Sequence, residues 1–236
     1  MHLAILMTNT DESDFAFRFA LDGQKFTDLI HLARPDWRLT VFAVKDGVIP
    51  DDLSRFGGVI ITGSPASTLS RAPWVAKLLG LIREMNDAGM PIFGVCFGHQ
   101  AIALALGGQI GDNPDGWFHG LSVNTFVTRP NCMRDLPDPV RLYASHKEQV
   151  VALPEGAVVI TKAEGCDVTG FAMGAHILTT QQHPEMTPAF MTALTEELAD
   201  QLGADNLAIA RATIGGPVDT QPFAEAMARF FEQAAG

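Results

Sequence analysis

The sequence has no long apolar run and no basic cluster, and each absence excludes a class of protein. Its uncharged apolar stretches fall well short of the ~20 residues that a membrane-spanning helix needs, so we expect no membrane span. Lys and Arg number 16 against 27 Asp and Glu, which gives a formal net charge of −11. Nucleic acids and anionic membranes bind clustered Lys and Arg, so the sequence predicts neither as a partner.

Cysteine is scarce, and the three cysteines, Cys96, Cys132 and Cys166, have no CxxC spacing. An odd number without that spacing disfavours a disulfide framework or a structural zinc site and indicates a reducing, cytoplasmic compartment. The acidic stretch "TDESD" (10–14) lacks the glycine and loop spacing of a calcium site, so we expect no metal there and predict the first turn of a helix. The start, "MHLAILMTNTDES", lacks a basic n-region and a cleavage site, which favours a first strand over a signal peptide.

The first hundred residues alternate between strand and helix patterns. The strand patterns are continuous apolar runs at Leu3–Thr8, Leu39–Val44, Gly58–Thr62 and Pro91–Val95. Between the last two runs, apolar residues from Trp74 to Met85 recur on one helical face, and the pattern stops at Gly89. Such a βαβ sequence predicts a doubly wound α/β fold with a mostly parallel, flavodoxin-like central sheet, in which ligands gather at the carboxyl ends of the strands.

The later part of the chain has a different pattern. From about 107 to 181, short β-type runs separated by turn residues predict antiparallel strands folded onto one side of the sheet. Two helices follow: one capped by Thr187 and ending at Gly203, and a last one with apolar residues from Phe223 to Ala234 on one side. We therefore expect residues 1–236 to form a single domain, with a core of about 1–186 and a helical extension at 187–236.

Cys96 lies in "GVCFG", between an apolar strand pattern and a helical pattern. G-x-C-x-G in this position has the form of a nucleophile elbow, in which glycines let strand and helix approach and expose the middle side chain. A thiol at a helix N-terminus is favoured as the reactive thiolate. The N–H of Phe97 could donate to a developing oxyanion. The simpler interpretation is a small buried cysteine, so catalysis requires a base elsewhere in the chain.

His183 is the candidate base among the seven histidines. It lies in "TTQQHPEM", where Pro184 ends a strand pattern, and Glu185 follows within reach of the imidazole. A carboxylate in that position would fix the tautomer of the ring. Cys96, His183 and Glu185 together would supply a nucleophile, a base and a group that orients the base.

The chain contains four motifs in this order: "ITGSPAS" (61–67), "GVCFGHQ" (94–100), "ASHKEQV" (144–150) and "QQHPE" (181–185). Together they resemble the class I (triad) glutamine amidotransferases, and in particular free-standing domains similar to the amidotransferase part of GMP synthetase. The resemblance spans roughly residues 1 to 186.

This resemblance implies that Cys96 attacks the side-chain amide of L-glutamine to form a γ-glutamyl thioester, while His183 moves the proton and Glu185 orients His183. It further implies an oxyanion hole from the N–H groups of Phe97 and the Gly63 turn. The positions associated with placing the glutamine are Gln100, Ser145 and His146. Ser145 and His146 could equally tie a hairpin together, and Gln100 could cap the elbow turn.

Two residues depart from the family pattern. Gln182 stands where an aromatic residue commonly precedes H-P-E, and Glu148 stands where the serine–histidine motif usually continues to Asp. Both changes concern substrate placement and leave the triad intact. Phe97, in place of a histidine directly after the cysteine, disfavours a related group of elbow-cysteine peptidases and chaperones.

The chain contains no nucleotide-binding motif of the form G-x-x-x-x-G-K-[ST], so we expect no cofactor and no synthetase activity of its own. The favoured hypothesis is an amidotransferase subunit that passes ammonia to a separate acceptor enzyme. A γ-glutamyl peptidase or hydrolase using the same triad is the alternative. A binding protein without turnover is a third possibility, which the intact Cys96–His183–Glu185 set disfavours.

Overall fold

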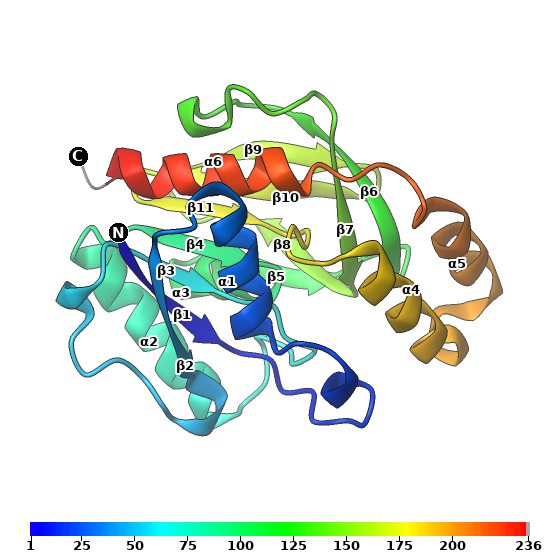
Figure 1. Ribbon diagram of the computed structural model, residues 1–236, viewed down its shortest axis with the longest axis horizontal. Coiled ribbons are helices and arrows are strands. Elements are labelled where there is room, and N and C mark those ends of the chain that lie inside the picture. The colour runs from blue at the N-terminus through cyan, green and yellow to red at the C-terminus, as the bar shows by residue number, and fades with distance from the viewer. Residues whose placement is uncertain (235–236) are drawn as a thin grey trace.

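The computed structural model describes residues 1–234 and has a large sheet with helices on both faces (Figure 1). The strands of this sheet are β1 (His2–Met7), β2 (Arg38–Ala43), β3 (Val59–Ile61), β4 (Ile92–Val95), β6 (Phe118–Phe126), β7 (Val140–His146), β9 (Ala157–Ala163), β10 (Cys166–Met173) and β11 (Ile177–Thr180). Their order is β2-β1-β3-β4-β11-β10-β9-β6-β7. The strands from β2 to β11 in this order are parallel, and the others continue the sheet in antiparallel fashion.

The helices are α1 (Asp22–Ala33), α2 (Pro73–Asp87), α3 (Phe97–Ala105), α4 (Pro188–Glu197), α5 (Ala199–Thr213) and α6 (Thr220–Ala234). Alternate residues of β1 point to opposite faces of the sheet, as strand geometry requires. Leu3 and Ile5 pack with residues of α1 and α6. Ala4 and Leu6 pack with residues of α2 and α3. The sheet is therefore covered on both faces, which confirms the predicted α/β fold. No helix within 1–234 has the length and apolar character to cross a membrane.

β11 differs from the prediction in a way that matters for the site. The later strands were expected to lie on one side of the parallel sheet, but they extend it, and β11 lies next to β4 in parallel register. Thr180 pairs with Val95 at the ends of these strands. The residues that follow the two strands, Cys96 and Gln181, therefore leave the sheet side by side. A separate pair, β5 (Gln109–Asp112) with β8 (Glu148–Ala152), was not predicted.

The stretch 10–14 was predicted to begin a helix, and this prediction is wrong. It lies in a loop, and α1 starts only at Asp22. The side chain of Asn9 accepts a hydrogen bond from the backbone N–H of Asp11, and Asp11 accepts one from that of Ser13. Such local bonds compete with helix formation, because they satisfy the backbone groups in a turn.

The C-terminal part has one more helical segment than predicted. Thr187 caps α4 as expected, with its hydroxyl accepting from Phe190 N. Helix α4 stops at Glu197, however, and α5 continues to Thr213 through a kink at Gly203, where φ is +75°. The glycine that was expected to end a helix therefore redirects one. The boundary between core and extension at residue 187 stays a prediction.

Candidate active site

Cys96 occupies a strained turn between β4 and α3. Its φ is 49° and its ψ is −103°. Among residues 1–234 it is the one residue other than glycine that has a positive φ. The flanking glycines allow this turn: a Cβ at Gly98 would lie 2.4 Å from Ile61 O, and one at Gly94 would lie 2.8 Å from Gly98 O. Both would collide with backbone. The close approach of strand and helix that the G-x-C-x-G pattern predicts is therefore present.

His183 and Glu185 follow β11 and meet the cysteine turn. The backbone N–H of His183 donates to Tyr143 O at 2.7 Å, which ties the segment to β7. His183 Nδ1 lies 2.7 Å from Glu185 Oε1. Because a carboxylate accepts, this nitrogen carries the hydrogen, and the ring directs Nε2 elsewhere. A Cβ at Gly63 would lie 2.8 Å from His183 Cε1 and 3.6 Å from Cys96 Cβ, so imidazole and thiol share one face of Gly63.

The electrostatic surroundings of His183 favour its protonated form. Burial alone would lower the pKa of the imidazole. The charges of Glu185 and Cys96, together with hydrogen bonds to both side chains, outweigh burial and raise the pKa of His183 well above its usual value. A thiol and an imidazole in this relation can exist as a thiolate–imidazolium pair, the reactive form of cysteine nucleophiles.

The two predicted oxyanion donors are the N–H of Phe97 and the Gly63 turn. Phe97 is the first residue of α3, so its N–H has no acceptor within the helix and is available to a substrate oxygen. The ring of Phe97 points away and stacks on Trp74 at 5.4 Å between centroids. The Gly63 turn lies opposite, against His183 and Cys96. The two predicted oxyanion donors thus come from neighbouring turns, after β4 and β3.

Gln181 is a site residue that sequence reasoning missed. Its Nε2 donates to Cys96 Sγ at 3.5 Å, and its Oε1 accepts from Gln100 Nε2 at 3.1 Å. Gln100 Nε2 also donates to Glu148 O at 2.7 Å. These buried amides form a chain from the thiol to β8. Gln181 was inside the quoted motif "QQHPE", but only the pairing of β4 with β11 shows which glutamine faces the sulfur.

Ser145 and His146, predicted to place the substrate, have different surroundings. Ser145 Oγ accepts from Trp117 Nε1 at 3.2 Å and lies 2.9 Å from His119 Nδ1, so its hydroxyl already has partners. His146 is buried and stacks on Phe118, and its Nδ1 has no hydrogen-bond partner in the described part of the chain. Burial and, secondarily, the charge of His183 lower the pKa of His146 to about 4. The substrate-placing roles of both residues stay predictions.

The structure also gives the contacts of Glu148 and Gln182, the two residues that depart from the family pattern. Glu148 Oε1 accepts from Ser67 Oγ at 2.8 Å, which joins β8 to the loop after β3. Gln182 is buried, and its Nε2 donates to Ser122 Oγ at 3.2 Å. Gln182 therefore fills space toward β6, whereas its neighbour Gln181 contacts the thiol.

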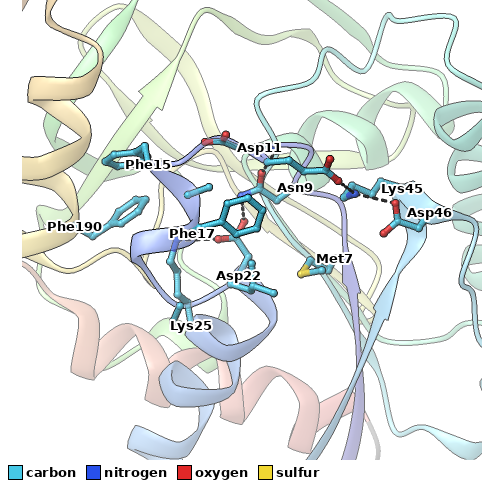
Figure 2. A pocket seen from close by; sticks show the side chains of 14 residues that line it. Met7, Asn9, Asp11, Phe15, Phe17, Asp22, Lys25, Lys45, Asp46 and Phe190 are labelled. Carbon is cyan, nitrogen blue, oxygen red and sulfur yellow. Dashed lines mark hydrogen bonds and ion pairs between the residues drawn. The ribbon is translucent and has the colours of Figure 1, made fainter.

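Access to the thiol is narrow, because Cys96 is only 6% exposed. A cleft of about 220 Å³ lies at the same edge of the sheet, at the carboxyl ends of β1 and β2, and does not include Cys96 (Figure 2). His183 and Glu185 are likewise absent from the lining of this cleft. Among residues 1–234, no group of three or more His, Cys, Asp or Glu is arranged to hold a metal ion.

A doubly wound sheet with a strained cysteine after a central strand defines the nucleophile-elbow class of α/β proteins. Within this class, the chain belongs to the family described as glutamine amidotransferase class-I, which matches residues 31–198.

Gamma-glutamyl peptidase 3 of Arabidopsis thaliana is 30% identical over 166 residues, covering 67% of each chain. One subunit of the glutamine-hydrolysing GMP synthase of Methanoculleus marisnigri is 30% identical over 165 residues, covering 69% of this chain and 84% of that protein. A solved glutamine amidotransferase from Thermotoga maritima is 18% identical and superimposes with a TM-score of 0.81 over 98% of both chains, which shows the shared fold.

Proposed function

We propose that the protein hydrolyses the side-chain amide of L-glutamine through Cys96, with His183 and Glu185 completing the triad. The Cys96 thiolate attacks the γ-carbonyl carbon, and the oxygen gains negative charge beside the N–H groups of Phe97 and the Gly63 turn. The C–N bond breaks as the His183 imidazolium gives its proton to nitrogen, which leaves as ammonia. His183 then takes a proton from water, the hydroxide attacks the γ-glutamyl thioester, and glutamate and the thiol are released.

One observation carries this proposal: the strained Cys96 and the Glu185-bound imidazole of His183 meet on one face of Gly63. Strained backbone at a reactive side chain is typical of functional sites, since folding alone would favour a relaxed turn. Gln181 donates to the thiol and is held by Gln100, so that an amide group lies beside Cys96 where the glutamyl part of the substrate would bind. We assign Gln100, Ser145 and His146 to the neighbourhood of this group.

The fate of the ammonia is part of the proposal. The chain has no nucleotide-binding motif, so we infer that a separate synthetase enzyme accepts the ammonia. The likeness to a protein named as one of the subunits of GMP synthase supports such a role. The unpaired cysteines suit a reducing cytoplasm, in which such an enzyme would meet its partner.

A second candidate function, cleavage of γ-glutamyl peptides, is favoured by two observations. The first is the likeness to proteins named γ-glutamyl peptidases. The second is the cleft in Figure 2. The order β4-β3-β1-β2 puts the Gly63 turn, which follows β3, between Cys96 and this cleft, and the ring of His183 lies against Gly63. A general acid protonates the departing nitrogen, so a bulky leaving amine would extend on the His183 side of the thiol. Glutamine releases only ammonia and needs no such space.

The cleft has the means to hold a polar group. Lys45 contributes an amine that Glu12 and Asp46 bind at 2.6 and 2.8 Å, while Lys25 lies over the ring of Phe190 (Figure 2). The volume of the cleft is about 220 Å³, below the usual 300–1,000 Å³ of a complete ligand site. A cleft of this size suits one part of a substrate.

The test is to measure glutamate release from glutamine and from a series of γ-glutamyl dipeptides. Ammonia and glutamate should form in equal amounts from glutamine, and Cys96→Ala should abolish both. Unchanged hydrolysis by Cys96→Ala would overturn the mechanism. Rapid dipeptide cleavage with little action on glutamine, lost in Lys45→Met, would favour the second function. Co-purification from the native cell would identify an acceptor enzyme.

A further inference from the structure

Two threonine hydroxyls lie buried beneath the turn that borders the thiol. Thr8 follows β1 and Thr62 follows β3, and neither side chain is exposed to solvent. The paired residues of these parallel strands end at Leu6 and Ile61. Beyond this point side chains replace the backbone ladder, since Thr8 N donates to Thr62 Oγ1 at 3.0 Å.

The carbonyl of Gly63 accepts from both hydroxyls. Thr8 Oγ1 donates to Gly63 O at 2.9 Å, and Thr62 Oγ1 donates to it at 3.1 Å. Thr8 Oγ1 also lies 3.0 Å from Thr62 O, which accepts from Gly98 N as well. The shorter contact of the Thr8 hydroxyl, 2.9 Å, is the one to Gly63 O. In this arrangement both hydroxyl protons point to Gly63 O, whose two lone pairs receive them, and Thr62 Oγ1 receives the N–H of Thr8.

This arrangement fixes which way the peptide after Gly63 faces. In a trans peptide the C=O and the next N–H point in opposite directions. With Gly63 O held between the threonines, the N–H of Ser64 points away from them. The α-carbon of Gly63 meanwhile lies against His183 and Cys96. If the hydroxyls were lost, this peptide could rotate and present its carbonyl oxygen to the developing oxyanion, and the carbonyl oxygen would repel that charge.

We propose that Thr8 is a positioning residue for the reaction: its hydroxyl, with that of Thr62, keeps the carbonyl of the Gly63 turn away from the thiol and its amide side available to the oxyanion. This inference rests on the proposed function, in which Cys96 adds to a γ-glutamyl carbonyl. Thr8 touches no reacting atom and acts through Gly63.

The variants Thr8→Val and Thr8→Ser separate the hydroxyl from the side-chain volume. Loss of one oxyanion donor typically lowers kcat by about 10²–10³-fold, so Thr8→Val should lose about that factor while KM changes by less than about twofold. Thr8→Ser should regain most of the activity, because it restores the donor. Thr169→Val is the matched control, since Thr169 is equally buried and its hydroxyl bonds Thr161, away from Gly63.

A second measurement needs no turnover. Glutamate γ-semialdehyde adds to a thiol to form a hemithioacetal whose oxygen resembles the oxyanion, whereas alkylation by iodoacetamide creates no such charge. Thr8→Val should bind the aldehyde about 10²-fold more weakly, yet its Cys96 should be alkylated at the wild-type rate. Equal aldehyde affinity in wild type and Thr8→Val would overturn the inference, as would equal losses in Thr8→Ser or Thr169→Val. A wild type that binds the aldehyde but hydrolyses no γ-glutamyl amide would instead refute the proposed function.

Discussion

His183 Nδ1 and Glu185 Oε1 lie 2.7 Å apart, and the two side chains are only 7% and 3% exposed. The carboxylate therefore acts on the imidazole with little screening by water. It fixes the ring and, together with Cys96, keeps the pKa of His183 high in spite of burial.

Glu185→Gln should lower the pKa of His183, because the amide keeps the shape of the side chain and removes its charge. We expect kcat/KM to fall by about 10²–10⁴-fold, the usual size of a general acid–base contribution, because the imidazole would no longer be oriented and charged correctly. NMR titration of the histidine ring carbons measures the pKa directly. A pKa equal to that of the wild type would refute the electrostatic role of Glu185.

The same pair predicts how stability depends on pH. A histidine whose pKa is raised by folding stabilises the folded state fully below the unfolded value of about 6.5, and this contribution is lost as pH rises through the folded pKa. The stability advantage of wild type over Glu185→Gln should therefore be larger at pH 6 than at pH 10. Urea unfolding of both proteins at the two pH values checks this difference.

For His119 we expect the free energy of unfolding to depend on pH in the opposite direction. Burial first, and the charge of His183 second, lower its pKa to about 4. Between pH 6.5 and about 4 the unfolded chain binds a proton that the folded chain does not, so this histidine destabilises the fold as pH falls. Relative to pH 7.5, the cost at pH 5.5 is about 1.4 kcal/mol. His119→Gln should remove this loss in urea unfolding, and an identical pH profile in wild type and variant would contradict it.

The three cysteines should differ in reactivity. Burial raises the pKa of Cys132 and of Cys166 to about 11, so both should stay protonated and unreactive at pH 8. A glutamine-like electrophile should label Cys96 alone in the native protein, and all three after unfolding in urea. Peptide mass spectrometry identifies the sites, and native labelling of Cys166 at the rate of Cys96 would contradict this assignment.

Phe231 of α6 should be far more important for stability than the ion pairs of the same helix. Its ring is fully buried. The ring packs so closely against Gly58 that a Cβ added at Gly58 would lie 2.5 Å from it. Phe231→Ala should cost about 3–5 kcal/mol in the free energy of unfolding. Arg34→Ala, which breaks the pairs with Glu225 and Glu232 near the surface, should cost less than about 1 kcal/mol. Equal losses would show that the helix is held by charge.

The sequence was most informative where local patterns decide the structure. Apolar runs and glycine spacing sufficed for β1 to β4 and for the bend at Cys96, because these depend on neighbours in the chain, whereas the parallel strand β11 was predicted to be antiparallel. The contacts of Gln181 and Thr8 could not be foreseen in this way. Each depends on which strands lie side by side, β4 with β11 and β1 with β3, and strand order is a long-range property. The loop at 10–14 was mistaken for a helix because its side chains compete for the backbone.

Helix α6 runs back along the sheet, so that its C-terminal end lies at the same end of the molecule as the N-terminus (Figure 1). Phe231 of this helix packs against Gly58, just before β3, by the amino ends of the parallel strands. Cys96 leaves β4 at the opposite, carboxyl end. A fusion partner or affinity tag attached at Met1 would therefore hang from the far side of the molecule. The edge that carries the thiol would remain open to a second enzyme arriving from solution.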